Sequence, residues 1–325
     1  MKRVGEQELL AIDAAEEVAR ICDGIREAVS SRFRRKGMVV GVSGGIDSSV
    51  VAALAVRAIG EKRVFALFTP EEDSSPESLR LGQLVSDWLQ IRSATEDISP
   101  ILRAAGCYRR RDEAIRSVIP EFTADYKCKL VIPDMLHGAQ YAVYSIVVQS
   151  PSGEMKKVRL PINAYLGIVA ATNFKQRTRK MMEYYYADLL HFAVAGTPNR
   201  LEYDQGFFVK NGDGSADIKP IAHLYKTQVY DLARYLGVPD EIQRRPPTTD
   251  TYSLQQSQEE FYFSLPLDKM DLCLYGRNNG ISAQELASVV GLEECEVHRV
   301  YEMIDSKRRA AEYLHMPPVI LARVQ

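Results

Sequence analysis

The sequence has few cysteines, no long apolar run and almost no net charge. Its five cysteines are scattered without a C-x-x-C pair, which argues against a disulfide framework and against a zinc site. No apolar run approaches the roughly 18 residues needed to cross a bilayer, and residues 1–13 lack the apolar core of a signal peptide. We therefore expect a cytoplasmic protein without a membrane partner, whose cysteines stay reduced and are buried as small hydrophobic side chains.

Lysine and arginine number 41 and aspartate and glutamate 43, so the net charge is −2. Proteins that bind nucleic acids usually carry a basic surface, so we expect no nucleic-acid partner. The 325 residues are 46% hydrophobic, as in an ordinary globular protein, and are enough for one large domain or two.

The opening of the chain alternates predicted helices and buried strands. Apolar residues recur every three or four positions over 9–33, which predicts an amphipathic helix. Residues 38–42 are a short apolar run typical of a buried strand, and 64–68 form a second such run. Between them lie a glycine-rich turn over 43–49 and a helical pattern over 50–59. This order predicts a parallel α/β sheet.

Further along the chain, the patterns that predict strands, turns and helices are more widely spaced. The segments 141–149 and 154–160 flank the turn sequence Ser-Pro-Ser-Gly, which predicts a β-hairpin. Residues 244–258 are rich in Pro, Thr, Ser and Gln, which predicts a loop. The other predicted elements are helices over 78–89, 175–190, 226–236, 282–290 and 294–313, and a strand over 192–197.

The turn after the first predicted strand has the composition of an anion site. Glycines let the backbone approach an anion closely, and the amino end of the following helix points N–H groups and a positive dipole at it. The serines add hydroxyl donors, and the Asp47 carboxylate can hold a divalent cation between phosphate oxygens. A lone Asp after a glycine turn would be interpreted as a helix cap, but the full S-G-G-x-D-S pattern favours phosphate binding. The turn consists of Ser43, Gly44, Gly45, Ile46, Asp47, Ser48 and Ser49.

This turn resembles the PP-loop of the ATP pyrophosphatases, which split ATP between its α and β phosphates and adenylate a substrate. It is neither a Walker A loop nor a dinucleotide-binding G-x-G-x-x-G motif. The rest of the chain is similar to the ammonia-dependent NAD synthetases, which amidate deamido-NAD. The resemblance is carried, in the family's order and spacing, by residues 173–179, 196–197, 202, 206–210, 212–217 and 224–228.

The resemblance implies a doubly wound, Rossmann-like parallel sheet of the adenine nucleotide alpha-hydrolase type, with helical elements at both ends of the chain. Residues 1–325 would form a single NAD synthetase-like α/β domain, with a C-terminal helical segment over 265–325. The stretch between the second strand and Asn173 is much longer than in the family. We therefore expect an insertion over 99–166 that contains the hairpin.

The resemblance also assigns roles to individual residues. Asp47 and Glu202 would hold Mg²⁺, and Asp47 and Lys226 would be catalytic. Lys226 taken alone would be interpreted as a solvated helix lysine. ATP would be bound by Gly41, Ser43, Gly44, Gly45, Asp47, Ser48, Ser49, Thr197, Lys226 and Thr248.

Four further residues match positions that bind deamido-NAD in the family: Arg177, Lys210, Asp217 and Lys307. Arg177 can clamp a phosphate or carboxylate with two hydrogen bonds, although it could also belong to the basic face of a surface helix. Asp217 would accept a hydrogen bond from the substrate or, alternatively, cap a turn. Lys307 follows Ser306, where the family has His.

The resemblance implies that the substrate carboxylate attacks ATP, pyrophosphate leaves, and ammonia then displaces AMP to give NAD. ATP is the co-substrate in this reaction. Ammonia would be taken free or from a separate glutaminase, because no glutamine-hydrolysing domain is recognisable. Family members are homodimers with the substrate site at the subunit interface, so we expect a homodimer.

Three alternatives remain open. The first is a related AMP-forming amide ligase that acts on another carboxylate, because the loop after Pro247 and the insertion depart from the family where substrate would be held. The second is a tRNA-modifying PP-loop protein, against which the acidic balance argues. The third is a nucleotide-sensing module that binds ATP without turnover.

Overall fold

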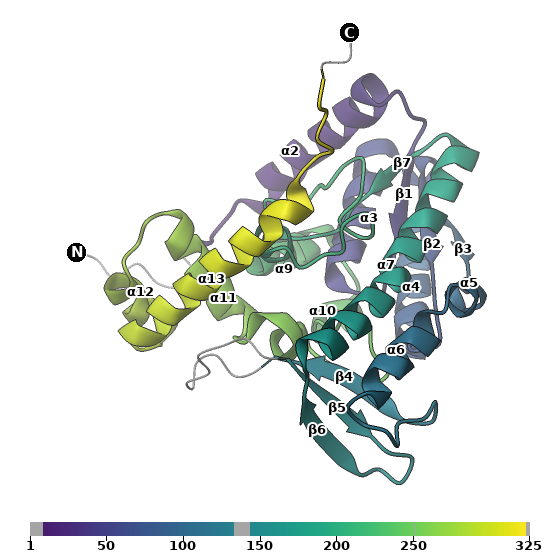
Figure 1. The fold of residues 1–325 in the computed structure, drawn as a ribbon. Coiled ribbons are helices and arrows are strands. Elements are labelled where there is room, and N and C mark those ends of the chain that lie inside the picture. Colours follow the sequence, from purple (N-terminus) through teal and green to yellow (C-terminus); the bar gives the residue numbers. More distant parts are fainter. Residues whose placement is uncertain (1–8, 133–143, 250, 323–325) are drawn as a thin grey trace.

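The centre of the fold is a four-stranded parallel sheet. The computed structural model describes residues 9–132, 144–249 and 251–322. The strands lie in the order β3-β2-β1-β7, and every neighbouring pair is parallel (Figure 1). The chain moves from β1 outward to β2 and β3, then returns to the other side of β1 to form β7. The strands are β1 Met38–Gly41, β2 Val64–Phe68, β3 Arg92–Thr95 and β7 Ala193–Ala195.

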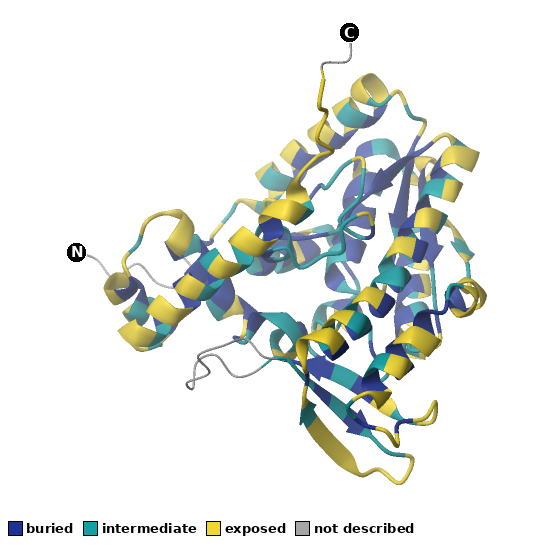
Figure 2. Ribbon diagram, in the orientation of Figure 1, coloured by how far each residue is buried: buried dark blue, intermediate teal, exposed yellow. Residues whose placement is uncertain are grey.

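Helices cover both faces of this sheet, because alternate strand residues point to opposite sides. Met38 and Val40 of β1 pack into a core with α2, α3, α4 and α9, whereas Val39 packs against α7 on the other face. The predicted doubly wound parallel sheet is therefore confirmed, and Figure 2 shows its strands buried between the helices. The helices are α2 Ala14–Glu27, α3 Ile46–Ile59, α4 Pro76–Leu89, α7 Ile162–Leu190 and α9 Lys226–Leu236.

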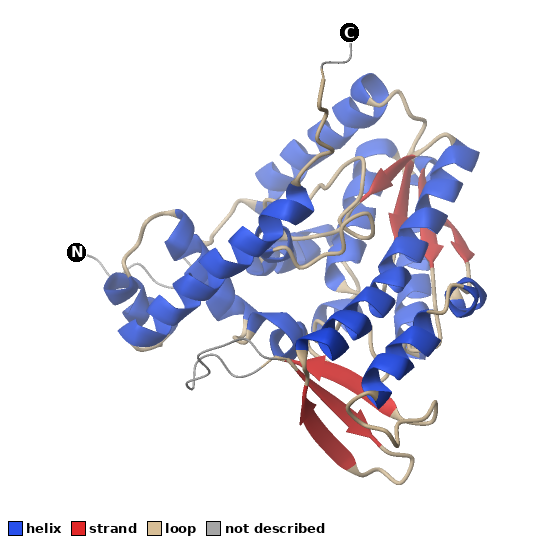
Figure 3. Cartoon of the chain, viewed as in Figure 1, coloured by secondary structure: helices blue, strands red, loops and turns tan. Residues whose placement is uncertain are grey.

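A second, antiparallel sheet lies apart from the first (Figure 3). Its order is β4-β5-β6, and β5 pairs with β6 from Ser145 opposite Arg159 to Gln149 opposite Met155. The predicted hairpin is thereby confirmed, although residues 141–143 of its first arm lie outside the described residues. One face of the sheet packs against α6 and α7. The range 99–166 holds α5 Ser99–Ala104, α6 Cys107–Arg116, β4 Lys127–Val131, β5 Ser145–Gln149, β6 Met155–Arg159 and the start of α7.

The last part of the chain is helical and has a hydrophobic core of its own. Leu201, in the first turn of α8, and Tyr225, directly before α9, both pack into this core. The C-terminal core is therefore continuous with the rest of the fold. The helices predicted over 282–290 and 294–313 correspond to α12 and α13. The remaining helices are α8 Arg200–Gln205, α10 Asp240–Arg244, α11 Leu267–Asn278, α12 Ala283–Val290 and α13 Glu294–His315.

The first described helix is shorter than the pattern over 9–33 predicts. It begins at Ala14 because the Asp13 carboxylate accepts hydrogen bonds from the N–H groups of Ala15 (2.9 Å) and Glu16 (3.0 Å). At its other end the chain widens into one π-helical turn, Ala28–Arg32.

Helix α7 begins at Ile162, well before the predicted start at residue 175. Ala164 and Ile168 near its beginning pack into the core of the small sheet, whereas Ala187 near its end packs under the large sheet. Because the helix contacts two different cores, its apolar residues do not form one continuous stripe. The spacing of apolar residues therefore does not reveal the first half of the helix.

Four of the five cysteines are buried, and all five are free thiols. Cys295 is exposed, which corrects the expectation that every cysteine is buried, because it lies in the solvent-facing first turn of α13. None of the described helices is both long and apolar enough to cross a membrane.

A buried ion cluster joins the small sheet's helices to the loops around the large sheet. The side chain of Lys175 in α7 is fully buried, and its Nζ donates to Glu71 Oε1 (3.0 Å), Asp73 Oδ2 (2.6 Å) and the carbonyl of Thr251 (2.8 Å). Arg111 of α6 bonds to the same Asp73 carboxylate (2.5 Å). Burial alone would raise the pKa of Asp73, but the charges of Lys175 and Arg111 lower it overall. The cluster fixes the loop after β2 and the backbone at Thr251 against α7.

Replacing Lys175 tests how much this cluster contributes to the stability of the fold. Lys175→Met leaves Glu71 and Asp73 buried with one cation fewer, so the free energy of unfolding should fall by about 3–5 kcal/mol. Lys156→Met is the control, because Lys156 pairs with Glu121 at the surface and both side chains are about half exposed. The free energy of unfolding of Lys156→Met should fall by no more than about 1 kcal/mol. Urea denaturation measures both, and equal losses would contradict the buried cluster.

Candidate active site

The glycine-rich turn lies where β1 ends and α3 begins. Gly44 has φ of +71°, and a Cβ on it would lie 2.7 Å from both the Ser78 carbonyl oxygen and Leu81 Cβ. A side chain is therefore excluded at this position by backbone conformation and by space. Gly45 is the last residue before α3, so the positive end of the helix dipole points into the turn.

The serines of the turn hold its shape. Ser48 Oγ and Ser49 Oγ both donate to the carbonyl of Gly45, at 3.1 and 2.8 Å. The Gly45 N–H donates to Ser43 Oγ, and the Ser43 N–H to Ser48 Oγ, each at 3.3 Å. Ser49 is fully buried, whereas Ser43 and Ser48 also line a cavity.

Two carboxylates and a lysine meet beside this turn. The ammonium of Lys226, the first residue of α9, bonds directly to the Asp47 carboxylate. Asn199 donates from Nδ2 to Asp47 Oδ1 (3.1 Å) and from its backbone N–H to Glu202 Oε2 (3.1 Å), so it bridges the two acids. Gln258 Nε2 donates to the other oxygen of Glu202 at 2.9 Å.

The charges of this cluster depend on one another. Burial and the negative charge of Asp47 raise the pKa of Glu202 to about 8. Burial alone would lower the pKa of Lys226, but Asp47 and Glu202 raise it above its usual value. Lys226 is 2% exposed, which rules out the interpretation as a solvated helix lysine.

One cavity collects most of the residues that the resemblance assigned to nucleotide and metal. It opens at the carboxyl ends of β1 and β7, at the point where the strand order reverses, which is the usual ligand position in such sheets. The assigned residues that line it are Ser43, Gly45, Asp47, Ser48, Thr197, Glu202, Lys226 and Thr248.

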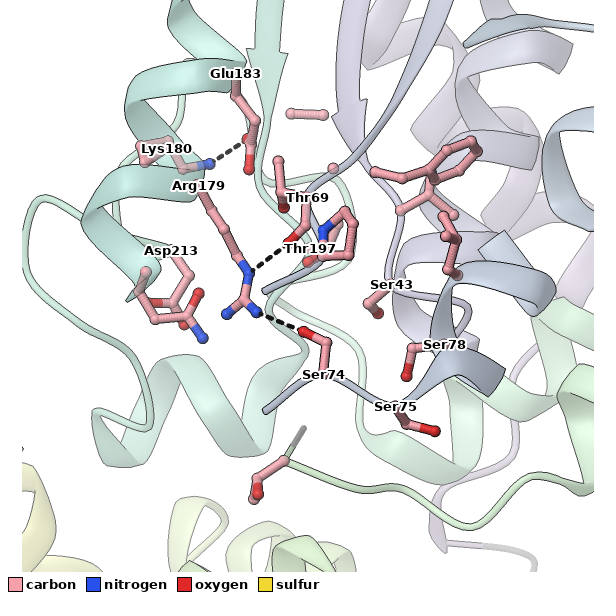
Figure 4. Close-up of a pocket in the computed structure, with 18 residues that line it drawn as sticks. Ser43, Thr69, Ser74, Ser75, Ser78, Arg179, Lys180, Glu183, Thr197 and Asp213 are labelled. Carbon is pink, nitrogen blue, oxygen red and sulfur yellow. Dashed lines mark hydrogen bonds and ion pairs between the residues drawn. The ribbon is translucent and has the colours of Figure 1, made fainter. Parts of the chain in front are cut away.

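A second cavity adjoins the first and shares Ser43, Ser78, Thr197 and Thr249 with it. Figure 4 shows the residues that line this second cavity. Gly41, the other glycine assigned to ATP, lines this second cavity together with Val42, which follows β1, and Phe68, the last residue of β2.

Charged side chains of α7 shape one wall of the second cavity. A Cβ on Gly41 would lie 2.7 Å from Glu183 Oε1, so a side chain there would displace the carboxylate of Glu183, which is paired with Lys180 at 2.6 Å. Arg179 reaches across to the loop after β2, with its Nε 3.4 Å from the Thr69 carbonyl and its Nη2 3.5 Å from Ser74 Oγ (Figure 4).

The residues assigned to deamido-NAD lie outside both cavities. Arg177 Nε donates to the carbonyl of Lys210 (3.3 Å), which brings these two residues together. The Lys210 ammonium donates to the carbonyls of Tyr313 (2.6 Å) and Met316 (3.0 Å) at the end of α13.

Asp217 and Lys307 have partners of their own. Asp217 Oδ2 accepts a hydrogen bond from the N–H of Val194 in β7 at 2.7 Å. Lys307 Nζ donates to the carbonyl of Tyr262 (2.5 Å) and lies over the Tyr262 and Phe263 rings. Burial lowers the pKa of Lys307 to about 7.

Several site residues were missed by the sequence argument. Asn199 stands three residues before Glu202, and this N-x-x-E spacing of a capping box was a usable signal, since both capping hydrogen bonds are present. Asp271 of α11 accepts hydrogen bonds from the N–H groups of Lys226 (3.1 Å) and Thr227 (2.7 Å). Neither Asp271 nor Gln258 stands in a pattern that points to the site.

The fold and this cavity define an α/β nucleotide-binding protein with a PP-loop. A model of the NAD synthase family matches residues 17–119 and 145–311. The chain is 59% identical over 316 residues to the NH(3)-dependent NAD(+) synthetase of Rhizobium meliloti (strain 1021), covering 97% of this chain and 94% of that protein. It is 34% identical over 288 residues to the NH(3)-dependent NAD(+) synthetase of Thermotoga maritima, covering 88% and 94%. The chain belongs to the NAD synthase family, as the resemblance predicted.

Solved structures share the fold. The NH3-dependent NAD synthetase of Campylobacter jejuni gives a TM-score of 0.62 at 23% identity, covering 96% of this chain and 100% of that chain. The NMN synthetase of Francisella tularensis gives 0.61 at 23% identity, covering 95% and 99%.

The geometry of the turn makes a prediction about stability. Gly44→Ala should lose more free energy of unfolding than Gly237→Ala, whose φ of +74° is similar but whose Cβ would meet open space. The left-handed conformation costs each variant about 1–2 kcal/mol, and only Gly44→Ala must also displace backbone at Ser78. Chemical denaturation compares the two, and equal losses would show that the turn has room for a side chain.

Proposed function

We propose that the chain catalyses the ATP-dependent amidation of deamido-NAD by ammonia, releasing pyrophosphate and AMP. The observation that carries this proposal is a single cavity that unites the S-G-G-x-D-S turn, the buried Asp47–Lys226 pair and Glu202. The family match and the relatives' names agree with it.

The protein's part in the reaction is to position charges. The substrate carboxylate attacks the α-phosphorus of ATP, and the bond to pyrophosphate breaks. Ammonia then attacks the acyl carbon of the adenylate, AMP leaves, and a proton is lost from nitrogen. Lys226 and the amino end of α3 would stabilise the negative charge that moves onto the phosphates.

Asp47 and Glu202 are the residues that would hold Mg²⁺. Both line the cavity, and Asn199 donates a hydrogen bond to a carboxylate oxygen of each, which holds the two acids side by side. No group of three or more His, Cys, Asp or Glu side chains forms a metal site among the described residues. Mg²⁺ needs only one or two carboxylates when phosphate oxygens complete its shell, so this pair fits it. When bound, the ion would neutralise phosphate charge.

The adenosine part of ATP would occupy the second cavity. Val42, Phe68 and Leu79 give it an apolar wall, and it meets the phosphate cavity at Ser43 and Thr197. The loop over 245–258 contributes Thr248 and Gln258 to the phosphate cavity, so it would keep water from the adenylate.

A homodimer would complete the deamido-NAD site. Arg177 lies on an exposed stripe of α7 whose following members are apolar, with Met181 52%, Tyr185 56% and Leu189 64% exposed. Large apolar side chains exposed at helical spacing are typical of a protein interface. Arg177, Lys210 and Asp217 would then bind substrate between the subunits, with Lys307 as the fourth ligand.

The proposed function also has a cellular compartment, an ammonia source and a role for the insertion. The free thiols suit a reducing cytoplasm. Ammonia would be used free or from a separate glutaminase. The insertion over 99–166 would support the nucleotide site, because its α6 contributes Arg111 to the cluster around Lys175.

Release of AMP is the test of this function. The purified protein is given ATP, Mg²⁺ and ammonium with deamido-NAD, or with nicotinate mononucleotide, the acid of which NMN is the amide. We expect AMP, pyrophosphate and NAD with deamido-NAD. AMP formation with another acid but none with deamido-NAD would replace this function with that of another amide ligase.

The metal assignment gives a prediction for Asp47. Asp47→Asn should lower the rate of AMP formation by at least about 100-fold, because it removes a charge that the Mg²⁺ site requires. Asp23→Asn, at a 74% exposed side chain on α2, should keep the wild-type rate. Normal AMP formation by Asp47→Asn would show that this carboxylate is not the metal ligand.

The substrate assignment gives a prediction for Arg177. Arg177→Ala should raise the KM for deamido-NAD about tenfold or more and leave kcat nearly unchanged, because the contact is made equally in the ground and transition states. Arg109→Ala, at an exposed arginine paired with Glu113, is the control. Steady-state kinetics at saturating ATP measure both variants, and an unchanged KM would remove Arg177 from the substrate site.

A further inference from the structure

We propose that Arg245 binds the pyrophosphate part of ATP and stabilises it as the leaving group. This inference rests on the proposed function, since it names a further residue for the same reaction. Arg245 is the residue after α10, and it lines the phosphate cavity together with Lys226 and Thr248.

The guanidinium of Arg245 lies against the glycine-rich turn. Its Nη2 donates to Ser78 Oγ at 2.7 Å, and its Nη1 lies 3.3 Å from the carbonyl of Gly44 and 3.5 Å from that of Ser43. All three partners are neutral oxygens. The contacts place the cation at the turn that would receive the phosphates, without cancelling its charge.

The surrounding charges leave Arg245 available for an anion. Within the described part of the chain, no ion pair is formed by Arg245, and the nearby carboxylate of Glu77 bonds to Arg80 instead. The other cation that lines this cavity among the described residues, Lys226, is bonded to Asp47. A polyphosphate entering the cavity would therefore meet in Arg245 a cation that has no ion-pair partner among the described residues.

The neighbouring arginine has the opposite surroundings. Arg244 is the last residue of α10 and pairs with Asp240 at 2.9 Å, where the two side chains are 80% and 77% exposed. Arg245 has extended backbone (φ −67°, ψ 124°), as expected before Pro246. The end of the helix thus turns Arg244 to solvent and Arg245 to the cavity, which provides a matched control.

The chemistry of pyrophosphate suits this side chain. When the α-phosphorus accepts the substrate oxygen, the electron pair of the broken bond goes to the oxygen that bridged the α and β phosphates of ATP, which becomes a terminal oxygen of pyrophosphate. A planar guanidinium donates two parallel N–H bonds to such oxygens and stays protonated throughout. Arg245 would exchange its neutral partners for the charged phosphates, and its effect would be strongest when the negative charge has moved onto the leaving group.

The test measures pyrophosphate itself, so it does not depend on turnover. Calorimetric titration of the full chain with pyrophosphate and Mg²⁺ gives its affinity. Arg245→Gln should weaken binding roughly 10- to 150-fold, the range for charged hydrogen bonds, whereas Arg244→Gln should change it less than about twofold. Arg245→Lys should restore part of the lost pyrophosphate affinity, because lysine keeps the positive charge but lacks the planar guanidinium that donates two parallel hydrogen bonds.

Kinetics separate this role from a structural one. In the complete reaction, Arg245→Gln should raise the inhibition constant of pyrophosphate and lower kcat/KM for ATP, with the KM for deamido-NAD nearly unchanged. If Arg245→Gln lowers the melting temperature but leaves the pyrophosphate affinity unaltered, the proposal is overturned. Arg245 would then have only the structural role of holding its loop to Ser78. A wild-type protein that binds pyrophosphate through Arg245 but forms no AMP would instead count against the proposed function alone.

Discussion

The site depends on the buried contact between the ammonium of Lys226 and the carboxylate of Asp47. It joins the first turn of α9 to the first turn of α3, and Asn199 connects the same carboxylate to Glu202 at the start of α8. None of these charges would be stable alone in so little water, because removing an ion from water is expensive unless a partner compensates it. Three helix amino ends are thereby held together at one edge of the sheet, which gives a phosphate group a prepared, positively polarised environment.

The parts of this arrangement that the sequence predicted are local ones. The strand, the S-G-G-x-D-S turn and the following helix are contiguous, so their composition alone indicates their geometry. Thr197 stands at the carboxyl end of a predicted strand, and parallel strands bring their carboxyl ends to one edge. Lys226 was assigned through family resemblance, because a lysine at a helix start has the same pattern whether it is solvated or buried.

The parts that could not be predicted are contacts between distant segments. Asp271 reaches Lys226 from a helix 44 to 45 positions away, and Arg245 and Gln258 reach the cavity from a loop without periodicity. Strand β4 was missed because Lys127 and Lys129 occupy its outer face, so it lacks the apolar run of a buried strand. The start of α7 was missed because that helix changes from one core to another along its length.

The position of Asp271 has a consequence for how the molecule can be divided. Its carboxylate holds the first two N–H groups of the helix that carries Lys226, and burial raises its pKa to about 6. The C-terminal helices therefore do more than cover the sheet, since one of them fixes the backbone at Lys226. A chimaera that takes these helices from a distant relative would inherit a misplaced ammonium unless an acid came with them, so this portion of the chain is not an interchangeable module.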